Sequence, residues 1–153
     1  MTFLSSKTLG PAKNVARELY LADTSVLARL SKQSVADAFS KLAVTGSIAV
    51  CAPVAFEVGI TARGPSHYSE AMRRLADYAT MPTTDGDHRR ALDIQATVAQ
   101  SSRHRALSLV DALVAAIAEG RGLTVLHYDA DFELIAGVTG QPHAWVVPRG
   151  TAD

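Results

Sequence analysis

Short apolar runs of strand length alternate with longer segments of helical periodicity along nearly the whole chain, and this alternation constrains the fold more than any other feature. The runs at 19–22 and 48–51 are typical of buried strands. Between them, residues 34–44 carry apolar side chains at helical spacing and end before Gly46, a residue type that commonly terminates helices. The pattern predicts an α/β fold with a mostly parallel central sheet flanked by helices on both faces.

The same alternation continues to the end of the chain. Residues 109–118 are apolar apart from Asp111, which is typical of a helix buried inside its domain. Further helices are expected from Pro53 onward, over 68–78 and over 85–103, and further strands over 79–82, 123–126 and 145–147. A length of 153 residues, 48% of them hydrophobic, suits one domain. We expect this domain to span 19–150, after a polar leader at 1–18.

The charge and cysteine content exclude several classes of protein. Fifteen Lys and Arg balance fifteen Asp and Glu, so no overall basic field indicates nucleic-acid binding. The single cysteine, Cys51, cannot form an internal disulfide or a thiolate zinc site. Neither the leader nor any later segment has the apolar length of a signal peptide or membrane span. We therefore expect a cytoplasmic protein without membrane contact.

Several acids stand out by their positions. Asp23 and Asp129 follow expected strands, and ligands of parallel sheets bind outside the carboxyl ends of the strands. Glu57 and Asp111 lie alone in apolar helical segments, where a buried carboxylate needs a partner or a cation. Asp131 is a possible fifth member. Oxygen ligands without Cys or clustered His favour Mg²⁺ or Mn²⁺ over zinc.

Each of these acids also has a purely structural interpretation. Asp23, Asp129 or Asp131 can cap the helix that follows it. Ser108 and Asp111 have the spacing of a capping box. Both interpretations stay open on the residues alone.

The order and context of the acids resemble those of the PIN-domain ribonucleases, and within them the VapC-type toxins of bacterial toxin–antitoxin pairs. The likeness extends from about Tyr20 to Val147. The matching segments, in chain order, are 21–25, 53–59, 108–116 and 126–132. They are similar to the family's opening strand with its first acid, the second-acid segment, the third-acid helix and the fourth-acid turn. One position departs from the family, which often has a small hydroxyl residue where this chain has His127.

The resemblance implies a metal-dependent endoribonuclease that hydrolyses RNA phosphodiester bonds and leaves a 5′-phosphate and a 3′-hydroxyl. The implied catalytic residues are Asp23, Glu57, Asp111 and Asp129, and the implied ligands of Mg²⁺ or Mn²⁺ are these four with Asp131. Thr24 or Ser25 can hydrogen-bond a ligand carboxylate and fix its orientation.

RNA beside an acidic site requires cations at its rim. Guanidinium binds phosphate in a bidentate geometry, so the candidates are the arginine groups Arg73-Arg74, Arg89-Arg90 and Arg103 with Arg105. Arg105, six residues before Asp111, is the leading candidate, and Arg103 lies close to it in the sequence. Arginines on helix surfaces are also commonly no more than solvated charges. Setting aside the five proposed site acids leaves fifteen cations against ten acids, so neutrality is compatible with two opposed patches.

The resemblance further implies a cognate antitoxin that covers the acidic groove, and often a homodimer. The sequence does not identify the RNA target. One alternative is a non-catalytic RNA- or protein-binding α/β module, whose acids are caps and surface charges. Another is a phosphoryl-transfer domain with strand-end aspartates. The second is disfavoured because no lysine follows Lys41 and no Asp-x-Asp follows the first strand.

Overall fold

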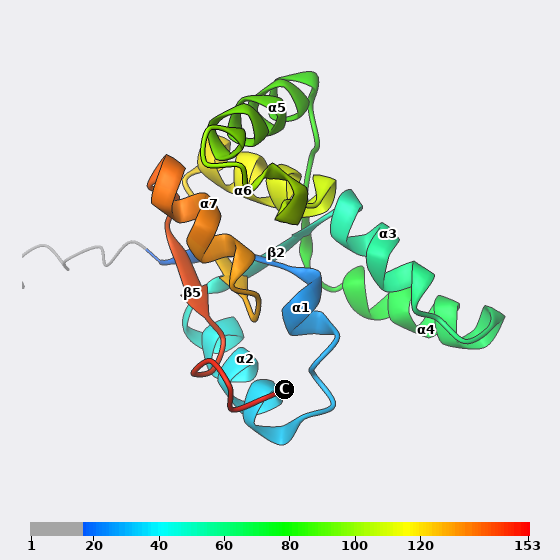
Figure 1. Ribbon diagram of the computed structural model, residues 1–153. Coiled ribbons are helices and arrows are strands. Elements are labelled where there is room, and N and C mark those ends of the chain that lie inside the picture. Colours follow the sequence, from blue (N-terminus) through cyan, green and yellow to red (C-terminus); the bar gives the residue numbers. More distant parts are fainter. Residues whose placement is uncertain (1–16) are drawn as a thin grey trace, which may run out of the picture.

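A five-stranded sheet runs through the middle of residues 17–153, the part of the chain that the computed structural model describes (Figure 1). The strands are β1 (Leu19–Ala22), β2 (Ser47–Cys51), β3 (Ala79–Met81), β4 (Thr124–His127) and β5 (His143–Trp145). They lie in the order β3-β2-β1-β4-β5, and all four pairings are parallel. The predicted α/β class with a parallel sheet is confirmed. The predicted leader lies outside the described residues except for its last two positions.

Helices cover both faces of this sheet. They are α1 (Thr24–Leu27), α2 (Gln33–Thr45), α3 (Ala52–Ile60), α4 (Pro65–Leu75), α5 (Asp85–Ala99), α6 (Leu109–Arg121) and α7 (Asp131–Thr139), with a 3₁₀ turn η1 (His104–Ala106). Successive side chains of β1 point to opposite faces. Leu21 packs in the core formed with α5 and α6, whereas Tyr20 and Ala22 pack in the core formed with α2. Figure 1 shows α2 on one side of the sheet and α5 and α6 on the other.

Strand β1 lies at the point where the chain order of the sheet reverses. It pairs with β2 on one side and with β4 on the other. The N–H of Asp23, just after β1, donates to the carbonyl oxygen of Leu126 in β4 at 2.9 Å. Parallel sheets bind ligands at such reversals, outside the carboxyl ends of the strands.

Helix α6 is the most deeply buried helix of the described chain, as its apolar sequence predicts. Every residue from 111 to 118 is buried. Ser108 caps its start by accepting the N–H of Asp111 at 3.0 Å. Gly122, in the left-handed conformation at φ 64°, ends it. The capping role suggested for Ser108 is confirmed by its contact with the backbone N–H of Asp111.

Some element boundaries differ from the prediction. Helix α5 ends at Ala99 rather than at 103, because Ser102 adopts a positive φ of 59° that a helix cannot contain. The last strand lies at 143–145 rather than 145–147. His143 pairs with Val125 of β4, and the apolar Val146, which follows the strand, packs in the α2-side core. Apolarity alone cannot distinguish strand pairing from core packing.

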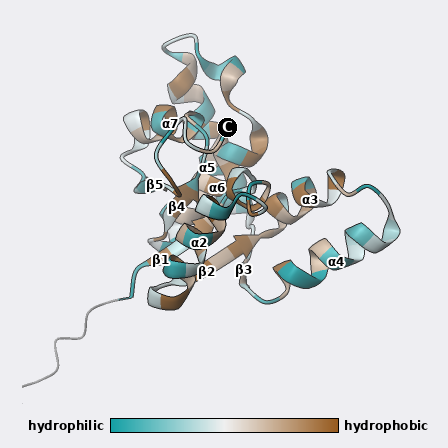
Figure 2. Cartoon of the chain, turned by 90° about the horizontal axis from the view of Figure 1, so that it is seen from below, coloured by the Kyte–Doolittle hydropathy of each residue, from teal (hydrophilic) through white to brown (hydrophobic). Residues whose placement is uncertain are grey.

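Helices α3 and α4 extend away from the sheet (Figure 2). Phe56 and Ile60 of α3 are 71% and 69% exposed, so its apolar sequence does not indicate a buried helix. Within residues 17–153, no helix combines the length and the apolar character that crossing a membrane requires.

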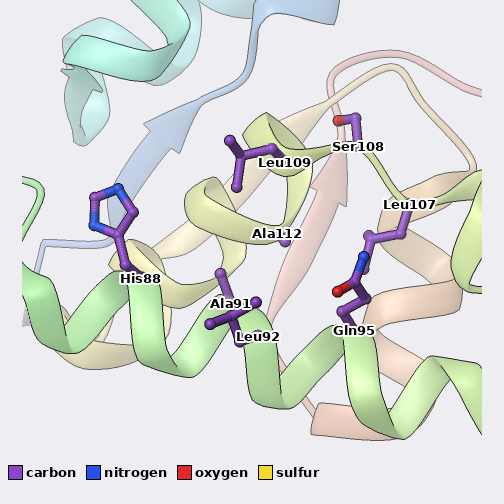
Figure 3. A pocket seen from close by; sticks show the side chains of 8 residues that line it. All are labelled: His88, Ala91, Leu92, Gln95, Leu107, Ser108, Leu109 and Ala112. Carbon is purple, nitrogen blue, oxygen red and sulfur yellow. The ribbon is translucent and has the colours of Figure 1, made fainter.

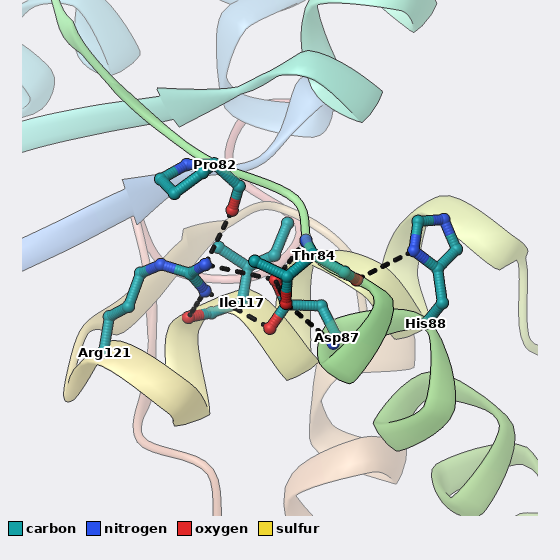
Figure 4. A network of polar contacts seen from close by, with 6 residues as sticks. All are labelled: Pro82, Thr84, Asp87, His88, Ile117 and Arg121. Carbon is teal, nitrogen blue, oxygen red and sulfur yellow. Dashed lines mark hydrogen bonds and ion pairs between the residues drawn. The ribbon is translucent and has the colours of Figure 1, made fainter.

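A salt bridge joins the start of α5 to the end of α6 (Figure 4). Arg121 contacts Asp87 at 3.1 Å and also donates to the carbonyl oxygen of Pro82 at 2.7 Å. Asp87 and Thr84 form a capping box in which the Thr84 N–H donates to the carboxylate. Burial raises the pKa of Asp87, but the hydrogen bonds from Arg121 and Thr84 outweigh it and hold that pKa below its ordinary value. The ionised pair therefore stabilises the fold.

We expect Asp87→Ala to lower the free energy of unfolding by about 3 kcal/mol, because it leaves the Arg121 guanidinium partly buried without its partner. Asp85→Ala, at an exposed position of the same helical turn, is the matched control and should cost far less. Because the folded-state pKa of Asp87 is depressed, the contribution is present at neutral pH and is lost as the pH falls through that pKa. Urea unfolding at neutral and acidic pH measures both effects, and equal losses in the two variants would contradict the assignment.

Candidate functional site

Three acids from separate elements meet at the carboxyl edge of the sheet. Asp111 lies in the first turn of α6, Asp129 follows β4, and Asp131 begins α7. One carboxylate oxygen from each lies within 4.8 Å of the others. Three negative charges at this distance repel one another strongly where the carboxylates are partly shielded from water. The arrangement therefore calls for a bound cation or for protonation.

Asp23 lies beside this group, and the structure confirms the capping role that its sequence position suggested. Its Oδ2 caps α1 by accepting the N–H of Ser25 at 3.0 Å and the Ser25 hydroxyl at 2.6 Å. The residue is only 2% exposed, and its Oδ1 is buried without a hydrogen-bond partner in the described part of the chain. An unpaired buried oxygen is costly, so this atom is suited to a cation.

Glu57 lies on α3, and its surroundings differ from those that the sequence suggested. The sequence suggested a carboxylate buried without a partner, whereas Glu57 is half-buried and accepts the Thr24 hydroxyl at 2.6 Å. The expectation of full burial is wrong because α3 is only partly covered, and Val54 is its fully buried residue. Glu57 is not within the 4.8 Å group, but its negative charge helps raise the pKa of Asp23.

The electrostatics of the acids have a common cause. Burial, followed by the negative charges of Asp23 and Asp129, raises the pKa of Asp111 to about 7. Burial also raises the pKa of Asp23, against the lowering effect of its hydrogen bonds with Ser25. Burial and the neighbouring Asp129 raise the pKa of Asp131. These three carboxyl groups, of Asp111, Asp23 and Asp131, thus resist ionisation in the absence of a positive charge, and perturbed carboxyl groups of this kind cluster at functional sites.

Two hydroxyl groups hold the acids in place. Ser25 donates to Asp23 and accepts the N–H of Tyr128 at 2.9 Å, so one hydroxyl connects the ends of β1 and β4. Thr24 makes the corresponding contact with Glu57. These bonds fix carboxylate orientation, as the supporting contacts of metal ligands commonly do.

His127 is the residue whose contribution the sequence did not reveal. It is completely buried, its Nδ1 accepts the N–H of Asp129 at 3.1 Å, and its Nε2 lies 2.7 Å from Nδ1 of His143. Burial and the neighbouring His143 lower the pKa of His127 to about 4, so the ring is neutral at physiological pH. The available signal was its position two residues before the fourth acid, where a side-chain acceptor reaches the backbone of that acid.

The two candidate RNA-binding arginines lie on the surface at η1. Arg103 and Arg105 are both exposed, and neither forms an ion pair within residues 17–153. The positive charge of Arg103 lowers the pKa of Asp131 and so opposes the effect of burial. At least one unpaired cation therefore lies close to the acids.

A pocket of about 290 Å³ lies nearby between α5 and the start of α6 (Figure 3). Its lining includes the exposed Leu92 and Leu109 and the side chain of His88, and it contains none of the five acids. It is mostly apolar and does not suit a cation.

The chemistry of the donor atoms suits a divalent metal ion. The three converging groups are all carboxylates, and the neighbouring Asp23 adds a buried Oδ1 without a hydrogen-bond partner in residues 17–153. Hard cations such as Mg²⁺ and Mn²⁺ prefer oxygen ligands, whereas zinc sites use His and Cys. His127 offers no free nitrogen, because both ring nitrogens are already engaged. The residues present fit Mg²⁺ or Mn²⁺.

Known proteins match this chain in sequence. The model of the PIN domain family matches residues 20–138. Ribonuclease VapC51 of Mycobacterium tuberculosis is 46% identical over 134 residues, which cover 88% of this chain and 97% of the relative. Ribonuclease VapC21 of the same species is 36% identical over 134 residues, covering 87% of this chain and 97% of the relative.

Solved structures share the fold. A DNA-bound VapBC from Salmonella typhimurium aligns with a TM-score of 0.67 at 13% identity, covering 85% of this chain and 99% of the other. VapC20 of Mycobacterium tuberculosis, described as a sarcin-ricin loop cleaving toxin, aligns with a TM-score of 0.57 at 20% identity, covering 80% and 99%. At sequence identities this low, the structural alignments show that these proteins share the fold of this chain.

Proposed function

Because the chain belongs to the PIN-domain family and is a homologue of the VapC ribonucleases, we propose that it is a divalent-metal-dependent endoribonuclease acting as the toxin of a toxin–antitoxin pair. The observation that carries the metal dependence is the meeting of Asp111, Asp129 and Asp131 beside the orphaned Oδ1 of Asp23. Carboxylates in such an arrangement are costly unless a cation binds them.

Each acid has a place in this proposal. Asp23, Glu57, Asp111 and Asp129 are the catalytic acids, and Asp131 joins them in holding Mg²⁺ or Mn²⁺. A divalent ion bound there supplies positive charge for the phosphate and lowers the pKa of water. The protein's own contribution is to orient the carboxylates and to exclude competing charges. Thr24 and Ser25 serve that orientation through their hydrogen bonds with Glu57 and Asp23.

The RNA backbone is proposed to lie across the carboxyl edge of the sheet, with Arg103 and Arg105 beside it. Arg103 is close enough to influence Asp131, and both guanidinium groups are exposed and free of ion pairs in the described region. Phosphate contacts of this kind provide affinity that does not depend on base sequence.

We expect Arg103→Ala and Arg105→Ala to weaken RNA binding uniformly across RNA sequences and each to reduce the salt dependence of binding by about one phosphate contact. Lys41→Ala, at an exposed cation on α2, is the matched control. Binding of a metal-free Asp23→Asn protein to short RNAs at several salt concentrations measures the slope without cleavage. A slope equal to that of the control would remove the residue from the RNA surface.

The proposal includes a cognate antitoxin as partner, a homodimer and a cytoplasmic location. Several proteins of the same fold were solved as VapBC complexes, and their descriptions support an antitoxin partner here. The exposed apolar side chains of α3, Phe56 and Ile60, flank Glu57 and provide surface for a protein partner.

Incubation of the purified protein with total RNA in Mg²⁺, Mn²⁺ or EDTA tests the proposed activity. Cleavage should require the metal and should yield 5′-phosphate and 3′-hydroxyl ends. The Asp23→Asn variant serves as the inactive reference. Cleavage that persists equally in EDTA and in this variant would contradict a metal-dependent nuclease, and metal binding without cleavage of any RNA would favour a non-catalytic binding module.

A further inference from the structure

The turn between β4 and α7 is held by one imidazole ring. The N–H of Asp129 donates to Nδ1 of His127 at 3.1 Å, and the N–H of Asp131 donates to Oδ1 of Asp129 at 2.9 Å. The first bond fixes the backbone of Asp129, and the second fixes its carboxylate. The direction of this acid toward Asp111 therefore follows from the placement of the ring.

The hydrogen bonds of His127 define its tautomer. Nδ1 accepts an N–H, so it carries no proton, and a neutral ring must then carry its proton on Nε2. That N–H points to Nδ1 of His143 on the neighbouring strand, at 2.7 Å. If the proton moved to Nδ1, the bond from the Asp129 N–H would be lost, and the contact with His143 would persist only if His143 also moved its proton to Nδ1. His143 therefore stabilises the tautomer that the Asp129 backbone requires.

Packing also prevents the ring of His127 from turning. The ring is completely buried, with the rings of Phe132 and His143 at centroid distances of 5.0 Å and that of Trp145 at 4.9 Å. The carbonyl oxygen of His127 accepts the N–H of Val146 at 2.9 Å, which anchors the backbone as well. Side chain and main chain are thus fixed from separate directions.

We propose that His127, locked in one tautomer by His143, is a positioning residue that presents Asp129 to the divalent ion. The proposal rests on the metal-dependent function argued above. His127 acts through the backbone of Asp129, and with both nitrogens occupied it is not itself a metal ligand. A hydroxyl or amide oxygen at this position can make the same contact with the second following N–H, as in Asx and Ser/Thr turns.

Two substitutions of His127, whose new side chains have the same number of heavy atoms, distinguish a role in positioning Asp129 from a role in packing. His127→Asn places an accepting oxygen at the δ1 position, whereas His127→Leu places a methyl group there. Both remove the ring and its stacking. Leu should weaken Mn²⁺ binding by about 10- to 100-fold and Asn by only about threefold or less, as expected for loss or retention of a contact that orients a metal ligand. Mn²⁺ titration by calorimetry or electron paramagnetic resonance measures this without RNA.

The thermal stabilities of the Asn and Leu variants should rank in the opposite order to their Mn²⁺ affinities. A general packing effect would give the same order for both quantities. The Asn variant buries a polar amide and should unfold at a lower temperature than the Leu variant in EDTA, although it binds Mn²⁺ more tightly. Equal Mn²⁺ affinities in the two variants would overturn the positioning role. Affinities that follow the order of stability would overturn it as well.

A second pair of substitutions can be made at His143, which is only half-buried on the edge strand β5. His143→Gln retains an oxygen that can accept the His127 N–H, whereas His143→Met does not. Met should weaken Mn²⁺ binding several-fold relative to Gln, even if the His127 variants do not fold. Equal affinities would overturn the locking role of His143.

Nitrogen chemical shifts of the His127 ring in the metal-free protein report the tautomer directly. We expect a protonated Nε2 and an unprotonated Nδ1, and the reverse would overturn the proposal whatever the metal does. If the wild-type protein has this tautomer and fails to bind Mn²⁺, the metal-dependent function is wrong and the positioning role falls with it. If it binds Mn²⁺ and the variants bind alike, only the positioning role is wrong.

Discussion

Replacing Asp111 with Asn should reduce RNA cleavage by at least about a thousandfold, the scale expected when an essential catalytic group is removed. The substitution preserves size and removes the charge that, with those of Asp129 and Asp131, would hold a cation. The capping contact at the start of α6 should survive, because it uses the backbone N–H of Asp111. Loss of activity would therefore not reflect loss of the helix.

Asp93→Asn provides the matched control for this prediction. Asp93 lies on the exposed face of α5 and is not among the converging acids. Cleavage of a labelled RNA in Mg²⁺ should be unchanged by it, and Asp23→Asn should behave like Asp111→Asn. An Asp111→Asn protein with more than about a tenth of wild-type activity would argue against a shared metal, since essential groups of one catalytic unit rarely tolerate loss.

The same substitution should increase the stability of the metal-free protein. The folded state raises the pKa of Asp111 to about 7 from an ordinary value of 3.8. Stability associated with this group is therefore fully present below pH 3.8 and is lost as the pH rises through about 7. At pH 8 in EDTA, we expect Asp111→Asn to raise the free energy of unfolding by about 1–3 kcal/mol. The advantage should shrink as the pH falls toward 5.

In the presence of Mn²⁺, the wild-type protein should instead be more stable than the Asp111→Asn variant. A ligand that binds only the folded state stabilises it by about 2.7 kcal/mol at a hundred times its dissociation constant. The wild-type protein should gain this stability and the Asp111→Asn variant little of it. Urea unfolding in EDTA and in Mn²⁺, at pH 6 and pH 8, measures both effects, with Asp93→Asn as the control. A variant less stable than the wild type in EDTA at pH 8 would show that Asp111 serves the fold rather than a metal.

The fold could be predicted well because local signals and tertiary structure agree. The strand-length apolar runs at 19–22 and 48–51 are parallel strands of the sheet, and α2 ends before Gly46 as predicted. The predicted end of α5 and the predicted position of β5 were wrong. They depend on the backbone conformation at Ser102 and on the register between β4 and β5. Neither quantity has a local signature in the side chains.

The candidate site was partly predictable for the same reason. Asp23 and Asp129 follow strands that the sequence identifies, so their meeting at one sheet edge can be expected. The sequence treated capping and metal binding as alternatives for Asp23, whereas only its Oδ2 serves the cap, and its Oδ1 is buried without a hydrogen-bond partner in the described residues. The contact between His127 and His143 joins two strands and has no local sequence pattern.

Helix α6 places the acidic edge and the Asp87 salt bridge on one rigid body. Asp111 lies in its first turn and Arg121 in its last, about 15 Å apart at the usual rise per residue. All of the residues from 111 to 118 are buried, so the helix cannot shift without disturbing the core that it forms with α5 and the sheet. The amides in the buried middle of α6, such as that of Val114, should therefore exchange with solvent only when the whole domain unfolds. Loss of the candidate site and loss of the fold are then a single cooperative event.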